Sequence, residues 1–208
     1  MSTNNQESPV SSRKERPILF SGPMVMAILD CRKTQARRVV KVPQSTLDVF
    51  FDDECDSTFC SDKPNGMKDP FAKMICCPYG QPGDRLWVRE SFRIRGGDEY
   101  AYQKHQGSVV YREGCEIIDD GPWHPSIYMP RWASRITLEI EAVRVERVHD
   151  ISEDDAQAEG VDFSANVTGI MFGTFRGAFS RLWDSINAGR GFGWDTNPWV
   201  WVIQFKRV

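Results

Sequence analysis

The residues best suited to chemistry lie in one basic stretch near the start of the chain. Residues 13–41 include eight basic side chains and two acidic ones, a net charge of +6, whereas the whole chain of 208 residues has a formal net charge of -3. Lys and Arg concentrated in this way are typical of a surface that contacts the phosphates of a nucleic acid. The side chains that we expect to make such contacts are Arg32, Lys33, Arg37 and Arg38.

The same stretch also has a structural interpretation. Its charges can be solvated along a strand, or paired with carboxylates such as Asp154, Asp155 or Glu159, which is the commoner use of a run of charges. The mildly acidic balance of the whole chain gives no support for non-specific nucleic-acid binding. We favour phosphate binding because the imbalance within residues 13–41 is large.

A second candidate lies on a short apolar segment further along the chain. Trp87 and Arg89 flank Val88, and the alternation of side chains along a strand places Trp87 and Arg89 on one face. An aromatic ring beside a basic group suits stacking on a base and contact with its phosphate. The alternative is that Trp87 is simply a core residue.

A third candidate is an aromatic and basic loop that contains Trp132, together with Trp123 and Tyr128. Aromatic side chains of this kind are suited to wall a pocket for a base. Equally, they can plug one end of the fold. The sequence does not favour either interpretation.

The cysteines do not predict a metal centre. The six cysteines are irregularly spaced, whereas a zinc site usually shows paired Cys-x-x-Cys spacings. We expect no metal and no cofactor, and we expect reduced thiols in a cytoplasmic protein, because the N-terminal residues have no apolar signal-peptide core. Cys31 is a candidate reactive thiol, since the adjacent Arg32 and Lys33 favour its thiolate form.

The elements that position these residues are short. We expect a disordered polar tail over residues 1–16, with order beginning at Pro17. A Ser N-cap at Ser152 and Gly160 bound one short helix, and apolar residues at helical spacing predict another helix whose core face includes Phe175 and Ile186. Strands are expected at residues 17–20, 39–40, 85–92, 109–111, 136–148 and 199–208, and helices at 24–30, 152–159 and 175–188.

The longest predicted strand changes phase in its middle. Ile140 ends one alternating apolar series and Val143 begins the next, which is out of step by one residue. Because a slip of one residue exchanges the two faces of a strand, we expect a bulge or bend near residues 141–142.

The spacing of the elements predicts one α+β domain over residues 17–208. Strands without regular helical crossovers favour a small, mostly antiparallel β-barrel with short peripheral helices. Residues 43–82 lack periodicity and form a long irregular insertion. No apolar run approaches the roughly 20 residues needed to span a bilayer.

The basic stretch resembles the ASCH family, a branch of the PUA-like superfamily. That family carries Gly-x-Lys-x-x-Thr-x-Arg after its first helix, and this chain has Lys33 and Arg38 in register, with Cys31 in place of Gly and Ala36 in place of Thr. Residues 83–88, 151–159 and 199–206 agree with the family in order and character. The chain also looks like a set of phage and prophage proteins of unassigned role. The resemblance implies a PUA-like barrel.

The resemblance also implies a chemistry. In ASCH amidohydrolases that act on acetylated cytidine, the motif Lys activates the motif Thr as nucleophile, and a Glu on a later helix carries the proton. Lys33 and Glu159 match the Lys and the Glu, but Ala36 has no hydroxyl, so the covalent route cannot run as written. Thr34 lies on the same face of a strand, and attack by water with Glu159 as base and Lys33 at the oxyanion remains open.

Three functions are therefore in view. The first, which we favour because the motif Thr is missing, is binding of RNA, DNA or a modified nucleoside, with RNA as the expected partner. The second is a hydrolase acting on a modified nucleoside or nucleic acid through Lys33 and Glu159. The third is a phage protein-interaction scaffold, which the absence of an overall basic charge leaves open.

Overall fold

The structure is a computed structural model that describes residues 13–41, 48–51, 58–62, 75–95, 108–114, 122–161 and 173–208. Strand β1 begins at Glu15, two residues before the predicted start at Pro17. The strands are β1 (Glu15–Leu19), β2 (Gln35–Val39), β3 (Asp48–Phe51), β4 (Thr58–Asp62), β5 (Ile75–Cys76), β6 (Arg85–Arg89), β7 (Phe92–Arg95), β8 (Ser108–Tyr111), β9 (Thr137–Arg147) and β10 (Trp199–Arg207). The α-helices are α1 (Gly22–Leu29), α3 (Glu153–Ala158) and α4 (Phe175–Asn187), and short 3-10 turns are η1 (Ser126–Tyr128), η2 (Arg131–Ala133), η3 (Val148–Asp150), η4 (Ala188–Arg190) and η5 (Trp194–Thr196).

A five-stranded sheet forms the centre of the fold, in the order β1-β6-β9-β10-β2. Only the β1–β6 pair within this sheet is parallel. The predicted α+β class is confirmed, but the predicted closed barrel is not, because β1 and β2 are the two edges of the sheet and do not pair in the part of the chain described. The Arg38 guanidinium joins β2 to the end of β1 instead, donating to the Leu19 carbonyl oxygen at 2.7 Å.

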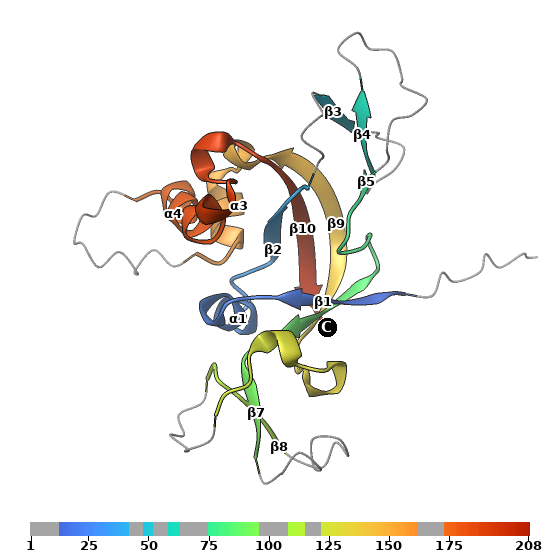
Figure 1. The fold of residues 1–208 in the computed structure, drawn as a ribbon, viewed down its shortest axis with the longest axis vertical. Helices are drawn as coiled ribbons and strands as arrows, with labels where there is room; N and C mark the ends of the chain where they lie inside the picture. Colours follow the sequence, from blue (N-terminus) through green and yellow to red (C-terminus); the bar gives the residue numbers. More distant parts are fainter. Residues whose placement is uncertain are drawn as a thin grey trace, which may run out of the picture.

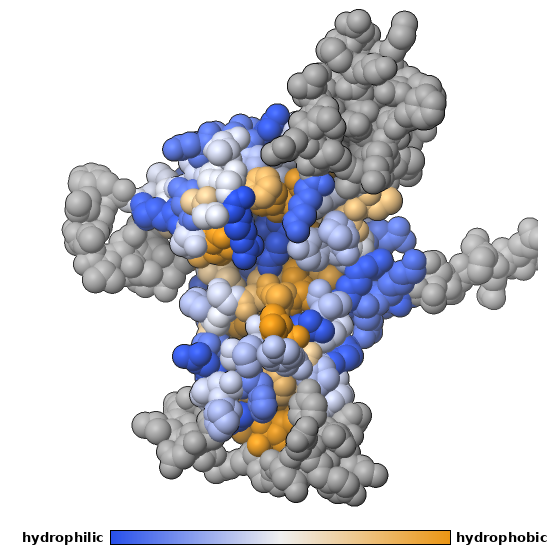
Figure 2. All heavy atoms as spheres, viewed as in Figure 1, coloured by the Kyte–Doolittle hydropathy of each residue, from blue (hydrophilic) through white to orange (hydrophobic). Residues whose placement is uncertain are grey.

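Apolar side chains pack on both faces of β10. Trp201, Ile203 and Phe205 belong to the main core with residues of β1, α1, β2, β6 and β9, while Val200 and Val202 face a second core under α3 and α4. The predicted apolar face of this strand is confirmed, and the second apolar face explains why the strand is central. In Figure 1, α3 and α4 lie together against one side of the sheet, and Figure 2 shows apolar residues through the middle of the same view with hydrophilic residues on either side.

The predicted irregularity in the long strand is confirmed. Ala142 pairs with Gln204 and Ile140 pairs with Phe205, so Glu141 is an extra residue without a partner in the ladder. This bulge keeps Val143 on the main-core side after the change of phase.

The short helix α3 has the ends that the sequence predicts. The Ser152 hydroxyl accepts a hydrogen bond from the Asp155 backbone N–H at 3.0 Å, and three acidic residues occupy the first turn, where they complement the helix dipole. After the C-cap residue Glu159, Gly160 adopts φ 75°, the left-handed conformation that suits glycine.

Helix α4 is confirmed, but the prediction that Ile186 faces the core is wrong. Phe179 and Trp183 are buried, and the stripe continues one turn later at Asn187. Ile186 is 46% exposed, because steps of four residues keep Phe179, Trp183 and Asn187 on one face and rotate Ile186 away from it.

Two smaller sheets lie outside the central one. Strands β3, β4 and β5 pair in that order within the segment expected to be an irregular insertion, so the prediction that residues 43–82 lack regular structure is wrong for these strands. Short strands with many intervening Pro and Gly residues leave little periodicity to detect. Strands β7 and β8 form a hairpin that projects at the opposite end of the molecule (Figure 1). None of the described helices combines the length and apolar character that crossing a membrane requires.

Gly160 provides a test of how tightly these elements meet. A Cβ atom at Gly160 would lie 2.7 Å from Lys33 Cβ and 2.8 Å from Ala27 Cβ, so Gly160→Ala combines a left-handed backbone cost with a steric overlap. We expect the free energy of unfolding to fall by more than the roughly 1–2 kcal/mol that the backbone conformation alone costs, measured by urea denaturation.

Two other glycines separate the contributions. Gly191 also has a positive φ, of 80°, but a Cβ there meets nothing within 4 Å, so Gly191→Ala measures the backbone cost alone. Gly189 has open space for a Cβ atom and no positive φ, so Gly189→Ala serves as the control without either cost. Equal losses for Gly160→Ala and Gly191→Ala would show that the overlap relaxes without cost.

Candidate functional site

The two residues matched to a catalytic pair are in direct contact. Lys33 Nζ lies 2.7 Å from Glu159 Oε2 and also donates to the Glu159 carbonyl oxygen at 2.7 Å. Their backbones form an antiparallel bridge that joins the start of β2 to the end of α3. Both side chains are buried, with 3% and 5% of their surface exposed. Burial lowers the pKa of Lys33, against the opposing effect of the Glu159 carboxylate.

Arg37 extends this pair into a network. Its guanidinium donates to Glu159 Oε1 at 3.1 Å, to Asp155 Oδ2 at 3.0 Å and to Glu146 Oε1 at 2.5 Å. The face of its guanidinium lies 5.8 Å from the centre of the Phe179 ring. Burial opposes the charged form, but the carboxylates of Glu159, Glu146 and Asp155 outweigh it and raise the pKa of Arg37.

Asp155 is the shared acceptor at the edge of the network. Its carboxylate also accepts from Arg144 at 2.8 Å and from the Gln35 side-chain amide at 2.8 Å. Burial raises its pKa, but the hydrogen bond from Gln35 and the charges of Arg37 and Arg144 prevail, so the pKa of Asp155 lies below its ordinary value. Three cationic and three carboxylate side chains thus balance one another: Lys33, Arg37, Arg144, Glu146, Asp155 and Glu159.

The four basic residues expected to contact phosphates therefore differ in burial and in their partners. Lys33 and Arg37 are buried and paired, as the structural interpretation of the basic stretch anticipated. Arg38 is half-buried at the seam between the sheet edges, and its guanidinium carbon lies 5.1 Å from the centre of the Phe20 ring. Arg32 is exposed, and within the described residues its ion pair is with the equally exposed Asp30, at 3.1 Å. Among these four residues, Arg32 has the guanidinium most accessible to a ligand.

Trp87 and Arg89 share a face as predicted. The Arg89 guanidinium stacks on the Trp87 ring at 4.6 Å. The neighbouring Leu86 and Val88 belong to the main core, so Trp87 and Arg89 point to the opposite face of β6. Trp87 is only 8% exposed, which leaves little of its ring surface for a base.

The aromatic loop packs beneath the β7–β8 hairpin. Trp132 is half-buried against a small core of Phe92, Met129 and Ala133. Trp123 carries the Arg93 guanidinium 4.7 Å from its ring centre, and Tyr128 is 64% exposed. The structure thus brings Trp132 into a separate cluster from Lys33 and Glu159.

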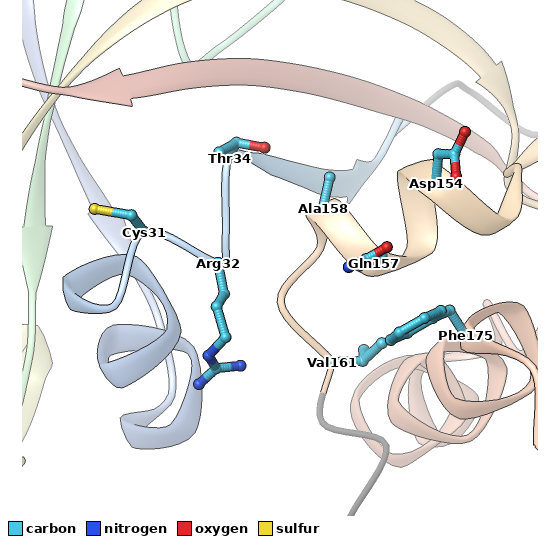
Figure 3. Close-up of a pocket in the computed structure, with 8 residues that line it drawn as sticks. All are labelled: Cys31, Arg32, Thr34, Asp154, Gln157, Ala158, Val161 and Phe175. Carbon is cyan, nitrogen blue, oxygen red and sulfur yellow. The ribbon is translucent and has the colours of Figure 1, made fainter.

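A cavity of about 700 Å³ opens beside the buried network. Arg32 and Thr34, from the turn between α1 and β2, lie on one side, and Gln157, Val161 and Phe175 lie on the other (Figure 3). A volume of this size is in the range of small-molecule sites. The described residues that line it are Cys31, Arg32, Thr34, Asp154, Gln157, Ala158, Val161 and Phe175.

The far wall of the cavity is held by a hydrogen bond between α3 and α4 and by the N-cap of α4. The Glu153 carboxylate accepts from the Phe175 backbone N–H at 2.7 Å, and the Thr174 hydroxyl accepts from the Gly177 N–H at 3.0 Å. A carboxylate at a helix N-terminus is favoured by the unpaired N–H groups there. These contacts fix Phe175 at the first turn of α4.

Cys31 and Ala36 occupy the positions where this chain departs from the family motif. Cys31 has φ 58° directly after α1, a conformation in which glycine is the least strained residue, which explains a glycine at this position of the motif. The Cys31 sulfur points away from the other cavity residues (Figure 3). Ala36 is fully buried in the main core. Within the described residues, no group of His, Cys, Asp and Glu is arranged to hold a metal ion.

Sequence reasoning missed several residues of the cavity. Phe175 has a helical apolar spacing that predicted a core role, and only its place at the first turn of the helix signals greater exposure. Gln157 and Val161 carry no chemical signal in the sequence. Their proximity to Arg32 follows from the bridge between Lys33 and Glu159, which are 126 residues apart.

Comparisons with known proteins show similarity only at the level of structure. No family model and no curated protein matches the sequence. One similar structure is a protein of Enterococcus faecalis assigned to the DUF984 family, with 9% identity and a TM-score of 0.42 over 95% of this chain and 82% of that chain. Another is an ASCH domain from Lactobacillus crispatus, with 10% identity and a TM-score of 0.43 over 93% of this chain and 79% of that chain.

The buried pair predicts a large coupling energy. Glu159→Gln leaves the Lys33 ammonium without its carboxylate, so we expect the free energy of unfolding to fall by about 3 kcal/mol. Lys33→Met combined with Glu159→Gln should cost less than the sum of the two single changes, because it removes both charges of the pair. Urea denaturation of the four proteins in the cycle measures the coupling.

An exposed pair serves as the matched control. Glu141 accepts from Lys206 at 3.3 Å, with 49% and 54% of the two side chains exposed. Glu141→Gln should cost less than about 1 kcal/mol. A similar small loss for Glu159→Gln would contradict the structural role of the buried pair.

The lowered pKa of Asp155 predicts a stability that depends on pH. Because the folded-state pKa lies below the unfolded value of about 3.9, the contribution of this carboxylate is fully present above about pH 4 and is lost as the pH falls through the folded-state pKa. Asp155→Asn should reduce the acid-dependent part of the stability loss, measured by urea denaturation at a series of pH values. An Asp195→Asn variant, changed at an exposed position in η5, should retain it.

Proposed function

We propose that this chain is an ASCH-type binding protein that holds a nucleoside, either free or within RNA, in the cavity between the α1–β2 turn and helices α3 and α4. The observation that carries the proposal is the composition of the cavity wall. It combines an aromatic ring with an amide, a carboxylate, a hydroxyl and an exposed guanidinium, and these groups are held on three separate elements.

Each part of a nucleoside has a suitable partner in this wall. Phe175 offers a ring for stacking, and Ala158 and Val161 continue the apolar surface beside it. Gln157 can both donate to and accept from the edge of a base. The hydroxyl of Thr34 and the charge of Arg32 suit a sugar and a phosphate.

The buried network supports this function by positioning the walls. Lys33 and Arg37 hold the end of α3 against β2, and neither side chain lines the cavity. This placement gives binding more support than hydrolysis, because a catalytic Lys33 or Glu159 would have to reach the ligand from a buried ion pair. Hydrolysis through Lys33 and Glu159 remains a prediction of the family resemblance.

A substitution at Phe175 tests the proposal. Phe175→Leu keeps an apolar side chain against the second core but removes the ring on which a base stacks. We expect the affinity for nucleosides to fall about ten-fold, since stacking of one base is worth roughly 1–3 kcal/mol. Binding is measured by calorimetric titration of nucleosides, mononucleotides and short RNA and DNA at two salt concentrations.

Ile186→Ala is the control, because Ile186 is exposed on the same helix and does not line the cavity. Equal affinity for the Phe175→Leu variant and the unchanged protein would place the ligand elsewhere. The absence of binding to every nucleoside, nucleotide and oligonucleotide in the series would overturn the proposal and favour a protein partner.

A further inference from the structure

The charged groups of the cavity are separated between its walls. Among the described residues of the lining, Arg32 is the one cationic side chain and Asp154 is the one anionic side chain. Arg32 follows α1, whereas Asp154 belongs to the first turn of α3. Apolar side chains of Val161 and Phe175 also belong to the lining. A ligand that satisfies all of these groups has a negative group, an apolar ring and a hydrogen-bond donor.

Arg32 is free to engage a negative group of a ligand. Its pair with Asp30 joins two side chains that are 47% and 49% exposed, and an exposed pair of this kind contributes about 0–1 kcal/mol. A phosphate offers Arg a stronger, bidentate contact than a single carboxylate oxygen does. Phosphate can therefore displace Asp30 at little cost.

Asp154 differs from the other carboxylates of α3. Glu153 caps α4, and Asp155 is committed to Gln35, Arg37 and Arg144. Within the described part of the chain, no hydrogen bond or ion pair holds the Asp154 side chain, which is exposed at the cavity. An ionised carboxylate only accepts hydrogen bonds, so it requires a donor from the ligand.

This requirement distinguishes between nucleobases. Adenine and cytosine carry an exocyclic amino group that donates, whereas hypoxanthine and uracil present a carbonyl oxygen at the corresponding position, and guanine carries one group of each kind. A carbonyl facing Asp154 places two acceptors together, which is unfavourable. The carboxylate therefore provides both attraction for one class of base and repulsion of the other.

Building on the proposed function, we propose that the cavity selects a nucleotide with an amino-bearing base, with its phosphate at Arg32, its ring beside Phe175 and its amino group donating to Asp154. The amide of Gln157, which both donates and accepts, pairs with the adjacent edge of the base. The selectivity resides in Asp154 and the preference for a phosphate resides in Arg32.

Matched ligand pairs test the two ends of the cavity separately. In the unchanged protein we expect CMP to bind about ten-fold more tightly than UMP, and AMP about ten-fold more tightly than IMP, from one hydrogen bond to a charged group. The preference should fall towards unity in Asp154→Asn, because an amide can donate as well as accept. The preference for CMP over cytidine should remain in that variant.

Changes at Arg32, at the phosphate end of the cavity, should alter the preference for a phosphate and leave the preference between bases. Arg32→Gln should remove most of the preference for CMP over cytidine and leave the preference for CMP over UMP. Asp30→Asn removes the competitor for Arg32 and should maintain or increase the preference for the phosphate. Calorimetric titration measures all of these affinities, with circular dichroism to verify that each variant is folded.

The outcomes distinguish this inference from the proposed function. Equal binding of CMP and UMP, and of AMP and IMP, by the unchanged protein would overturn the selectivity while leaving nucleoside binding in place. A preference for amino-bearing bases that survives in Asp154→Asn would also overturn it. If no nucleoside or nucleotide binds, the inference fails together with the proposed function.

Discussion

The arrangement of the helices on the sheet depends on neutralising the buried guanidinium of Arg37. A permanently charged group without exposed surface must have opposite charges close to it, since an isolated buried charge is strongly unfavourable. The required carboxylates come from β9 and α3, which are more than 100 residues away in the chain. Neutralisation of one side chain on β2 therefore fixes where α3 lies on the sheet.

The same constraint shapes the surface beside the network. Glu159 and Asp155 face the sheet, whereas the neighbouring Asp154 is exposed and lines the cavity. Helix α4 is then fastened to α3 through Glu153, which brings an aromatic ring to the cavity. The carboxylates of one six-residue helix thus have different surroundings: Glu153 and Asp155 bond to neighbouring elements, and Asp154 lines the cavity. These three acidic side chains differ in their contacts because they point in different directions.

Local signals in the sequence were reliable for the features that local physics determines. The change of phase around Glu141 predicted the bulge, and Ser152 and Gly160 predicted both ends of α3, since backbone geometry and capping act over a few residues. The α+β class also followed from these elements. The closed barrel did not, because pairing between the two edge strands depends on the global curvature of the sheet.

The candidate site was less predictable, because the burial of its residues depends on contacts between distant parts of the chain. The sequence identified Arg32, Lys33, Arg37 and Arg38 as one basic group, and nothing local shows that two of them are buried against carboxylates while Arg32 is exposed. Trp87 was placed correctly beside Arg89 by alternation, but the face of the sheet that the two residues occupy depends on strand order. Phe175 was recognised as apolar, and its position at a cavity depends on the contact between α3 and α4.

The bulge at Glu141 has a consequence for how this chain can change over evolution. On one side of it Leu138 and Ile140 face the main core, and on the other side Val143 and Val145 do, while Arg144 and Glu146 face the charged layer. Removing a residue elsewhere in this strand would exchange the two sets beyond the deletion, turning the charges into the apolar core. Deletion of Glu141 itself would instead restore a continuous ladder, because Ile140 and Ala142 already pair with the adjacent residues Phe205 and Gln204. Among descendants of this chain, β9 is therefore expected to vary in composition and to change its number of residues only at the bulge.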